Sequence, residues 1–456
     1  MRNKYSLLLL FLAWLPFSQA QETNYFFIRQ EANKLHYDST SAPMQAFFQK
    51  WNRMVISHQG NISIIHIGGS HVQAGTLPHR IRTNILSAYP TLVSGRGLIF
   101  PYSAAANCNN PNDYRVHCPQ RVILTRNVHK EPAYPLGLCG IAVTAHDEPT
   151  TIQILNTDTQ FDYSVTRVVI LGHSPQGVVP QLSYDNHYTS PSYIDSQRHR
   201  YIFNLARTVD SIEILLPCGD GQSFTLNGVQ LSSRNAGITY NSIGVNGAAV
   251  PDYLKCNLHD DLHLLHPDLV IFGIGINDAH GTDFDSVAFR RNYLKLCDSI
   301  RSINPQCAFI FITNNDCYRK TSRRSYSVNT NGLQVRDVCY RLAAATGGAV
   351  WDQFEIMGGL RSMEKWQKAG LAQKDKVHFT RAGYQLIGDM FSQALLDAIH
   401  SAKPVKAIKT DNKVKAKSPD DLPRGLRRKP RKHVTIQPTP SPNSNENDNR
   451  FPYISD

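Results

Sequence analysis

Short apolar runs alternate with amphipathic helical patterns in this chain, and this alternation restricts the possible folds more than any other feature. Between residues 44 and 55, apolar side chains recur every three or four positions, which predicts a helix with one buried face. Residues 62–67 are an isoleucine-rich run that ends at two glycines, which is typical of a buried strand opening onto a turn. Residues 78–89 can form the helix that follows.

The same alternation returns later in the chain. Apolar strands are expected at residues 269–274 and 308–313, and a short one at 349–351. Helical patterns cover residues 289–303 and the segment that begins at Thr380. Strands that are separated by helices pair in parallel, so the sequence predicts an α/β fold whose parallel sheet is covered on both faces.

Residues 97–241 break this alternation. Short β-type runs dominate there, and Asn227-Gly228 predicts a two-residue hairpin turn within residues 224–231. Several strands at such spacing are typical of an antiparallel β-sandwich. We therefore expect an insert at 97–241 that divides the α/β domain into two parts, residues 21–96 and residues 242–402.

The first twenty residues have the pattern of a secretory signal. Arg2 and Lys4 precede an apolar run at 7–15, and the small residues Ser18 and Ala20 precede the expected cleavage point. A membrane span needs about 20 apolar residues, and this run is half as long. We expect residues 1–20 to be removed, the protein to be exported to the periplasm or outside the cell, and no transmembrane segment elsewhere.

The formal net charge of +12 is distributed unevenly. Residues 403–456 hold 13 Lys or Arg against 6 Asp or Glu, a net charge of +7, and residues 1–20 hold +2, which leaves +3 for residues 21–402. The C-terminal segment is also poor in apolar residues, so we expect a disordered basic tail at 403–456. This tail could contact an anionic envelope polymer weakly. A nearly neutral body argues against a nucleic-acid-binding protein.

Nine cysteines are present, and none forms a C-x-x-C pair, so zinc ribbons and thioredoxin-like motifs have no support. Cys108 and Cys118 flank a loop rich in proline and asparagine and could close a small disulfide. Cys297, Cys307 and Cys339 lie in helical or strand patterns, and there we expect buried free thiols.

Polar residues follow the predicted strands at four places, and in open α/β sheets sites lie beyond the carboxyl ends of strands. The four runs are Gly-Gly-Ser-His at 68–71, Gly-Val-Asn-Gly-Ala at 244–248, Gly-Ile-Gly-Ile-Asn-Asp at 273–278 and Asp-Lys-Val-His-Phe-Thr at 375–380. Ester hydrolysis needs a nucleophile, a base, a carboxylate that orients the base, and donors for the oxyanion. These four loops contain all of these groups.

In this order, the four runs resemble the sequence blocks of the SGNH (GDSL-type) hydrolase family. The resemblance implies a three-layer α/β/α fold with a parallel, flavodoxin-like sheet, and a serine esterase activity that needs neither metal nor cofactor. It implies that Ser70 is the nucleophile, His378 the general base and Asp375 the residue that orients His378. The backbone N–H groups of Ser70 and Gly247 and the side-chain amide of Asn277 would form the oxyanion hole.

One position departs from the family pattern, because the Asp that usually follows the first glycine of the first block is Gly69 here. That Asp supports the loop, so its absence bears on the positioning of the nucleophile. The stretch from Trp351 to Thr380 resembles an exported branch of the family that includes peptidoglycan and polysaccharide O-acetylesterases. Members of that branch can carry an inserted β-sandwich similar to a carbohydrate-binding module. The implied substrate is an O-acetylated polysaccharide or peptidoglycan.

Two other functions stay open at this point. A lipid acyl hydrolase or an acyltransferase would use the same four blocks, and a glycan-binding protein with a decayed catalytic loop would fit the change at Gly69. Trp366 and Met363 could line the acyl or sugar pocket, but we favour plain core packing for both.

Three histidines at 259, 263 and 266 have a spacing that can gather a metal on one helix face. The residue after His259 is Asp260 and not the Glu of a zinc-protease motif, so we favour a solvated helix face. His71 could line the pocket beside Ser70. Asp278 is expected to be a loop hydrogen-bonding residue rather than a metal ligand.

Overall fold

The structure is a computed structural model that describes residues 25–402, apart from 106, 107, 109, 110, 159, 162, 234–236 and 324. The chain divides into a compact unit, Met1–Lys403, and a second unit, Pro404–Asp456. The expected signal at 1–20 and the expected tail at 403–456 lie outside the described residues. Within the described part, no helix combines the length and the apolar composition that a membrane crossing requires.

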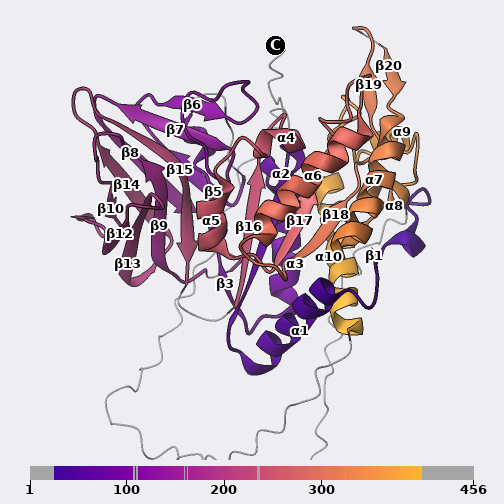
Figure 1. The fold of residues 1–456 in the computed structure, drawn as a ribbon, viewed down its shortest axis with the longest axis horizontal. Coiled ribbons are helices and arrows are strands. Elements are labelled where there is room, and N and C mark those ends of the chain that lie inside the picture. Colours follow the sequence, from indigo (N-terminus) through magenta and orange to yellow (C-terminus); the bar gives the residue numbers. More distant parts are fainter. Residues whose placement is uncertain are drawn as a thin grey trace, which may run out of the picture. The chain divides into compact units, whose positions relative to one another are not determined.

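A seven-stranded sheet forms the centre of the α/β part (Figure 1). Its strands pair in parallel, except for the edge strand β1, which pairs antiparallel with β21. This confirms the predicted α/β class with a parallel sheet. In spatial order, the strands are β1 (Leu35–Tyr37), β21 (Ala349–Trp351), β18 (Ala308–Ile312), β17 (Leu269–Gly273), β2 (Asn61–Gly68), β16 (Gly237–Gly244) and β3 (Val93–Gly95).

Two groups of helices cover this sheet. One group is α1 (Ala42–Ser57), α3 (Thr76–Ala88) and α10 (Arg381–Ser401), and the other is α5 (Leu258–Leu265), α6 (Ser286–Arg301) and α7 (Asn331–Thr346). Three of these helices, α1, α6 and α10, begin where a side chain accepts a hydrogen bond from a free backbone N–H group. Asp285 caps α6 in this way through Val287 and Ala288, and Thr380 caps α10 through Gly383.

The helix after the first strand begins differently from the prediction. A short helix α2 (Ser70–Gln73) comes first, and α3 begins at Thr76 rather than at Pro78. Gly75 separates the two helices with a φ of +79°, a conformation that favours glycine. A Cβ at this position would also lie 2.4 Å from the Pro111 side chain. The break is therefore set by a contact with a distant part of the chain.

The described strands between Gly97 and Ser232 form two antiparallel sheets. One has the order β11-β10-β14-β8-β5, and the other has the order β12-β13-β9-β15-β7-β6, with β4 paired to β15. Their bounds are β4 (Gly97–Ile99), β5 (Tyr114–His117), β6 (Ile123–Arg126), β7 (Ile141–His146), β8 (Pro149–Asn156), β9 (Val165–His173), β10 (Gln181–Ser183), β11 (Tyr188–Thr189), β12 (Tyr193–Asp195), β13 (Arg200–Val209), β14 (Ser211–Pro217) and β15 (Ser223–Ser232). The predicted antiparallel insert is present in the fold.

The predicted hairpin at Asn227-Gly228 is wrong. Residues Ser223–Ser232 form one continuous strand, β15, whose register against β9 shifts between Leu226 and Gly228. A Cβ at Gly228 would lie only 3.0 Å from Leu98 and 3.1 Å from the Cys139 sulfur. The glycine is therefore required by an irregularity in the strand and by the close approach of Leu98 and Cys139. An Asn-Gly pair in a sequence does not distinguish such a position from a turn.

The structure also corrects the end of the insert. Residues 237–241, which the sequence assigned to the insert, belong to β16, which pairs in parallel with β2 in the central sheet. The buried Asn241 connects the two regions, since its side chain donates to the Ile64 carbonyl and accepts from the Leu98 N–H. Apolar periodicity identifies a strand but not the sheet it joins, and this explains the error.

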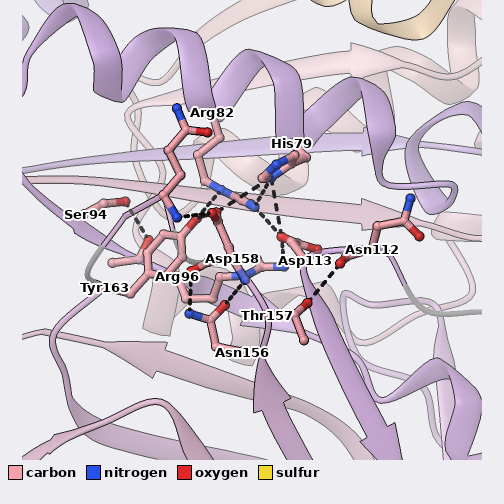
Figure 2. A network of polar contacts seen from close by, with 12 residues as sticks. His79, Arg82, Ser94, Arg96, Asn112, Asp113, Asn156, Thr157, Asp158 and Tyr163 are labelled. Atoms are coloured by element: carbon pink, nitrogen blue, oxygen red, sulfur yellow. Dashed lines mark hydrogen bonds and ion pairs between the residues drawn. The ribbon is translucent and has the colours of Figure 1, made fainter. Parts of the chain in front are cut away.

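A buried charged cluster attaches the insert to α3 (Figure 2). Asp113, at the start of β5, forms ion pairs with Arg82 of α3 and with Arg96. Tyr163 accepts a hydrogen bond from Arg82 Nε at 3.0 Å and donates one to Asp158 at 2.6 Å. Because buried charges are retained only when they are paired, these contacts define where the insert meets the helix.

All nine cysteines are free thiols in the structure, including Cys108 and Cys118. The disulfide that the sequence allowed between these two residues is therefore not formed. Cys297, Cys307 and Cys339 are buried, as predicted.

Candidate active site

Ser70, His378 and Asp375 form a continuous chain of hydrogen bonds. Ser70 is the first residue of α2, directly beyond β2, and His378 lies in the loop before α10. Ser70 Oγ lies 2.8 Å from His378 Nε2, and His378 Nδ1 lies 2.8 Å from Asp375 Oδ2. A hydroxyl, an imidazole and a carboxylate in this order can transfer a proton away from the hydroxyl.

The backbone around Asp375 holds its carboxylate in place. Asp375 Oδ1 accepts hydrogen bonds from the N–H of Val377 at 2.8 Å and the N–H of His378 at 3.0 Å. Its other oxygen remains directed at the imidazole. The backbone N–H of Gln373 donates to the His378 carbonyl at 2.8 Å, so the loop is closed on both sides of the histidine.

Glycines allow the elements around Ser70 to pack closely. A Cβ at Gly68 would lie 2.2 Å from the Val72 side chain, and a Cβ at Gly244 would lie 2.3 Å from the backbone nitrogen of Gln73. Both distances are shorter than any van der Waals contact, so a side chain at either position would displace α2. The ends of β2 and β16 can therefore meet α2 only as glycines.

Gly69 borders the amide group of Asn277. A Cβ at Gly69 would lie 3.2 Å from Asn277 Nδ2, which is a tight contact. Gly69 itself has φ −96° and ψ −138°, so its backbone does not require glycine. The small residue leaves room for the Asn277 amide beside the start of α2.

Three donors that the sequence singled out come from three loops at the same edge of the sheet. Asn277 Nδ2 donates one hydrogen bond to the Ala248 carbonyl at 2.9 Å, which leaves its second N–H for another acceptor. Gly247 has a φ of +84°, in the region that favours glycine. Among the described residues, the backbone N–H groups of Ser70 and Gly247 have no hydrogen-bond acceptor. These donors are available to a bound anion or carbonyl oxygen.

Asp278 anchors the loop that carries Gly247, as the sequence predicted for a loop hydrogen-bonding residue. Its carboxylate accepts from the N–H of Val250 at the start of the short helix α4 (Val250–Tyr253), and Asp252 accepts from the N–H of Ala249 at 2.8 Å. Burial raises the pKa of Asp278 to about 7. These bonds hold the Ala248 carbonyl in position to accept from Asn277.

His71 and His66 lie behind the site, and the sequence pattern did not reveal this arrangement. The two buried rings line a cavity of about 30 Å³, and each bonds a tyrosine hydroxyl through Nδ1 at 2.8 Å, His71 to Tyr384 and His66 to Tyr240. Burial lowers the pKa of both histidines to about 3. The ring of His71 lies 5.1 Å from that of His378, so His378 packs against a neutral neighbour.

The other residues that the sequence considered lie away from this arrangement. Met363 and Trp366 are fully buried, and the Trp366 indole donates to the Met357 carbonyl, so both belong to the core. His259 and His263 stack on α5, whereas His266 ends that helix with a φ of 40°. Among the described residues, no group of three or more His, Cys, Asp or Glu side chains is placed to hold a metal ion.

Comparisons with known proteins show which family model and which folds this chain resembles. Residues 218–386 match the model of the GDSL-like lipase/acylhydrolase family. The chain is similar in structure to one described as "Peptidoglycan O-acetylesterase in action, 5 min", with 19% identity and a TM-score of 0.67, covering 81% of this chain and 99% of that one. The match shows that the two chains share a fold over nearly the whole length of the solved structure.

Two further solved structures resemble smaller parts of the fold. The acetyl xylan esterase AlAXEase is 19% identical with a TM-score of 0.28, over 35% of this chain and 81% of that one. A family two carbohydrate esterase from Cellvibrio japonicus is 11% identical with a TM-score of 0.27, over 63% and 99%. A search of curated protein sequences finds no match.

Proposed function

We propose that this chain, whose residues 218–386 match the model of the GDSL-like lipase/acylhydrolase family, is an exported serine esterase that removes O-acetyl groups from a polysaccharide. The observation that carries the proposal is the hydrogen-bonded chain Ser70–His378–Asp375. The family match begins at residue 218, within the last part of the insert, and so does not include Ser70, which precedes the insert in the sequence.

In the proposed reaction, Ser70 Oγ attacks the carbonyl carbon of the acetyl ester while His378 Nε2 accepts the hydroxyl proton. Asp375 keeps the proton of His378 on Nδ1, so that Nε2 is free to act as the base. It also stabilises the imidazolium that forms. The negative charge that develops on the carbonyl oxygen is stabilised by the N–H groups of Ser70 and Gly247 and by the free N–H of Asn277.

The second half of the reaction reverses these roles. His378 donates its proton to the sugar oxygen, the ester bond breaks, and the acetyl group remains on Ser70. A water molecule then attacks the acyl-serine while His378 takes its proton. Acetate leaves, and the proton returns to Ser70 Oγ. The cycle consumes one water and uses only side chains and backbone groups of this chain.

The substrate class is supported by the fold. The solved structure with which this chain shares a fold is described as a peptidoglycan O-acetylesterase, and that chain is covered over 99% of its length, including the region of the insert. We therefore propose an O-acetylated polysaccharide or peptidoglycan as the substrate. The division of the chain is part of the proposal, with a signal at 1–20, a hydrolase domain in two parts that resumes at β16, an insert between them and a basic tail at 403–456.

A comparison of acetylated polymers tests this function. The purified protein and its Ser70→Ala variant are incubated with O-acetylated peptidoglycan and with acetylated xylan, and released acetate is measured. We expect release from at least one polymer by the wild type, and a loss of release with unchanged folding in the variant. Equal release by both proteins would contradict the role of Ser70.

The same assay separates the alternatives. Hydrolysis of long-chain esters in preference to acetyl esters would indicate a lipid acyl hydrolase, and transfer of acetyl to an added glycan would indicate an acyltransferase. A phosphonate probe that fails to label Ser70, together with binding of the glycan, would indicate a glycan-binding protein. The aligned hydrogen bonds of Ser70 weigh against this last function.

A further inference from the structure

Lys376 occupies an unusual backbone conformation inside the loop that carries the base. It follows Asp375 directly and precedes His378 by two residues, and its φ is 58°. Residues other than glycine rarely adopt this left-handed region, because their Cβ approaches the backbone too closely. Such a conformation persists only where surrounding contacts hold it.

The backbone of Lys376 is held from two directions. Its N–H donates to the Gln373 carbonyl at 3.2 Å, and its carbonyl accepts from the N–H of Tyr318 at 3.1 Å. Tyr318 is the first residue of β19 (Tyr318–Lys320), which pairs with β20 (Tyr326–Val328) in a small antiparallel sheet separate from the others. This β19–β20 sheet therefore contacts the loop at the position of its strain.

The side chain of Lys376 is held by the same sheet and by a neighbouring helix. Its ammonium lies 4.6 Å from the ring centre of Tyr318 and 5.6 Å from that of Tyr326, both within the range of cation–π contacts. It also pairs with Glu364 of α9 (Met363–Lys368) at 3.0 Å. Only 19% of the lysine side chain is exposed, so it is held between these groups and does not extend freely into solvent.

We propose that Lys376 is a positioning residue that holds the strained loop against the β19–β20 sheet and so aligns Asp375 with His378. This proposal rests on the proposed function of the same site. The two backbone bonds that Asp375 Oδ1 accepts come from the residues directly after Lys376. If residue 376 relaxes to an ordinary conformation, these N–H groups turn away, and the carboxylate loses its alignment with the imidazole.

The test compares three substitutions at this position in the whole protein. Lys376→Met removes the charge but keeps the strain, Lys376→Gly removes both the charge and the strain, and Lys376→Arg keeps the charge. The control is Lys365→Met, which removes an exposed lysine from α9, the helix that carries Glu364. For each protein, kcat and KM are measured with p-nitrophenyl acetate.

We expect Lys376→Met to lower kcat by about tenfold with KM almost unchanged, because a misaligned base affects the chemical step and not substrate binding. Lys376→Gly should lose less than Lys376→Met, since glycine adopts a φ of 58° without strain. Lys376→Arg should stay within about threefold of the wild type, as it retains the charge for Glu364 and the two rings. Lys365→Met should match the wild type.

A spectroscopic measurement separates this inference from the proposed function. The Nδ1 proton of His378, hydrogen-bonded to Asp375, gives a downfield proton resonance that is assigned by its loss in His378→Gln. Lys376→Met should shift or broaden this resonance, whereas Lys365→Met should not. This reading needs no turnover, so a wild type that hydrolyses no ester would contradict the proposed function and leave the positioning role measurable.

Several outcomes would overturn the inference. These are a wild-type kcat with an unshifted resonance in Lys376→Met, a loss confined to KM, or a loss in Lys376→Gly as large as that in Lys376→Met. If Lys376→Met does not fold, Glu364→Gln weakens the same ion pair from its more exposed partner. Glu364→Gln should then shift the resonance and lower kcat, both by less than is expected for Lys376→Met. The absence of these two effects would contradict the proposal.

Discussion

Arg82 of α3 and Asp113 at the start of β5 form an ion pair in which both side chains are almost completely buried, with 2% and 3% of their surfaces exposed. The pair joins α3, the helix that follows α2, to the insert (Figure 2). Arg96 pairs with the same carboxylate oxygen of Asp113 at 2.7 Å. One carboxylate is therefore the shared ion-pair partner of two buried guanidinium groups.

We expect Asp113→Ala to destabilise the protein strongly, because it leaves two guanidinium groups buried without a counter-charge. Removing one partner of a buried ion pair typically costs about 3–5 kcal/mol. The free energy of unfolding is measured by denaturant titration. Asp195→Ala is the control, since its pair with Arg198 is partly exposed and should contribute less than about 1 kcal/mol. Equal effects of the two variants would contradict the prediction.

The same carboxylate should make stability depend on acid pH. Burial alone would raise the pKa of Asp113, but Arg96 and Arg82 outweigh it and hold the pKa at about 2. An unfolded aspartate titrates near about 3.9. The stabilisation is therefore complete above about pH 4 and is lost as the pH falls from about 4 to about 2. The difference in Tm between the wild type and Asp113→Asn should shrink over this interval, and a constant difference would refute the assignment.

Asp375→Asn should lower kcat by about 10³–10⁴, because an amide can stabilise the wrong tautomer of His378 and cannot stabilise the imidazolium. KM should change little. Hydrolysis of p-nitrophenyl acetate measures both constants. Asp298→Asn, at an exposed position on α6, provides the matched control. If Asp375→Asn retained more than about a tenth of the wild-type kcat, Asp375 would not be the orienting residue.

Asn277→Ala should lower kcat by about 10²–10³, the usual loss on removal of one oxyanion donor. Asn277 also donates to the Ala248 carbonyl, so the thermal unfolding midpoint is measured alongside to detect a displaced loop. A fall in kcat with an unchanged midpoint supports the oxyanion role. A fall in both kcat and the unfolding midpoint would instead indicate that Asn277 supports the structure of the loop.

Asp278→Asn should reduce the dependence of stability on pH near neutrality. Burial raises the pKa of Asp278 to about 7, whereas the unfolded carboxyl titrates near about 3.9. The raised pKa therefore contributes stability that is complete below about pH 4 and is lost as the pH rises to about 7. Asparagine still accepts from the Val250 N–H but does not ionise. The variant should gain stability relative to the wild type as the pH rises from about 4 to about 7, and parallel curves over this interval would exclude this role.

Local patterns in the sequence were sufficient for several elements of the α/β part. The periodicity at residues 44–55 predicted α1, and Thr380 marked the start of α10, because a helix face and a helix cap depend on residues only a few positions apart. The contact of His378 with Asp375 is of the same kind, since the two residues lie three positions apart in one loop.

The errors all concern contacts between distant residues. Asn227-Gly228 predicts a turn from its own chemistry, but the crowding of Gly228 against Leu98 and Cys139 places it within a continuous strand. The apolar pattern at 237–241 predicts a strand but not which sheet the strand joins, and only its pairing with β2 assigns it to the central sheet.

The amino-acid sequence by itself determined the alternation of strands and helices, the caps and the chemical groups at the strand ends, because these depend on neighbouring residues. The resemblance in sequence implied that Ser70 pairs with a histidine 308 positions away, and the tertiary structure gives the geometry of that pair. Only the tertiary structure decided that neutral His71 packs behind that histidine, and that Lys376 is held in a strained conformation by a separate small sheet. The reason is physical. Which surfaces exclude water together, and which polar groups must then pair, is settled by the packing of the whole chain and leaves no local pattern in the sequence.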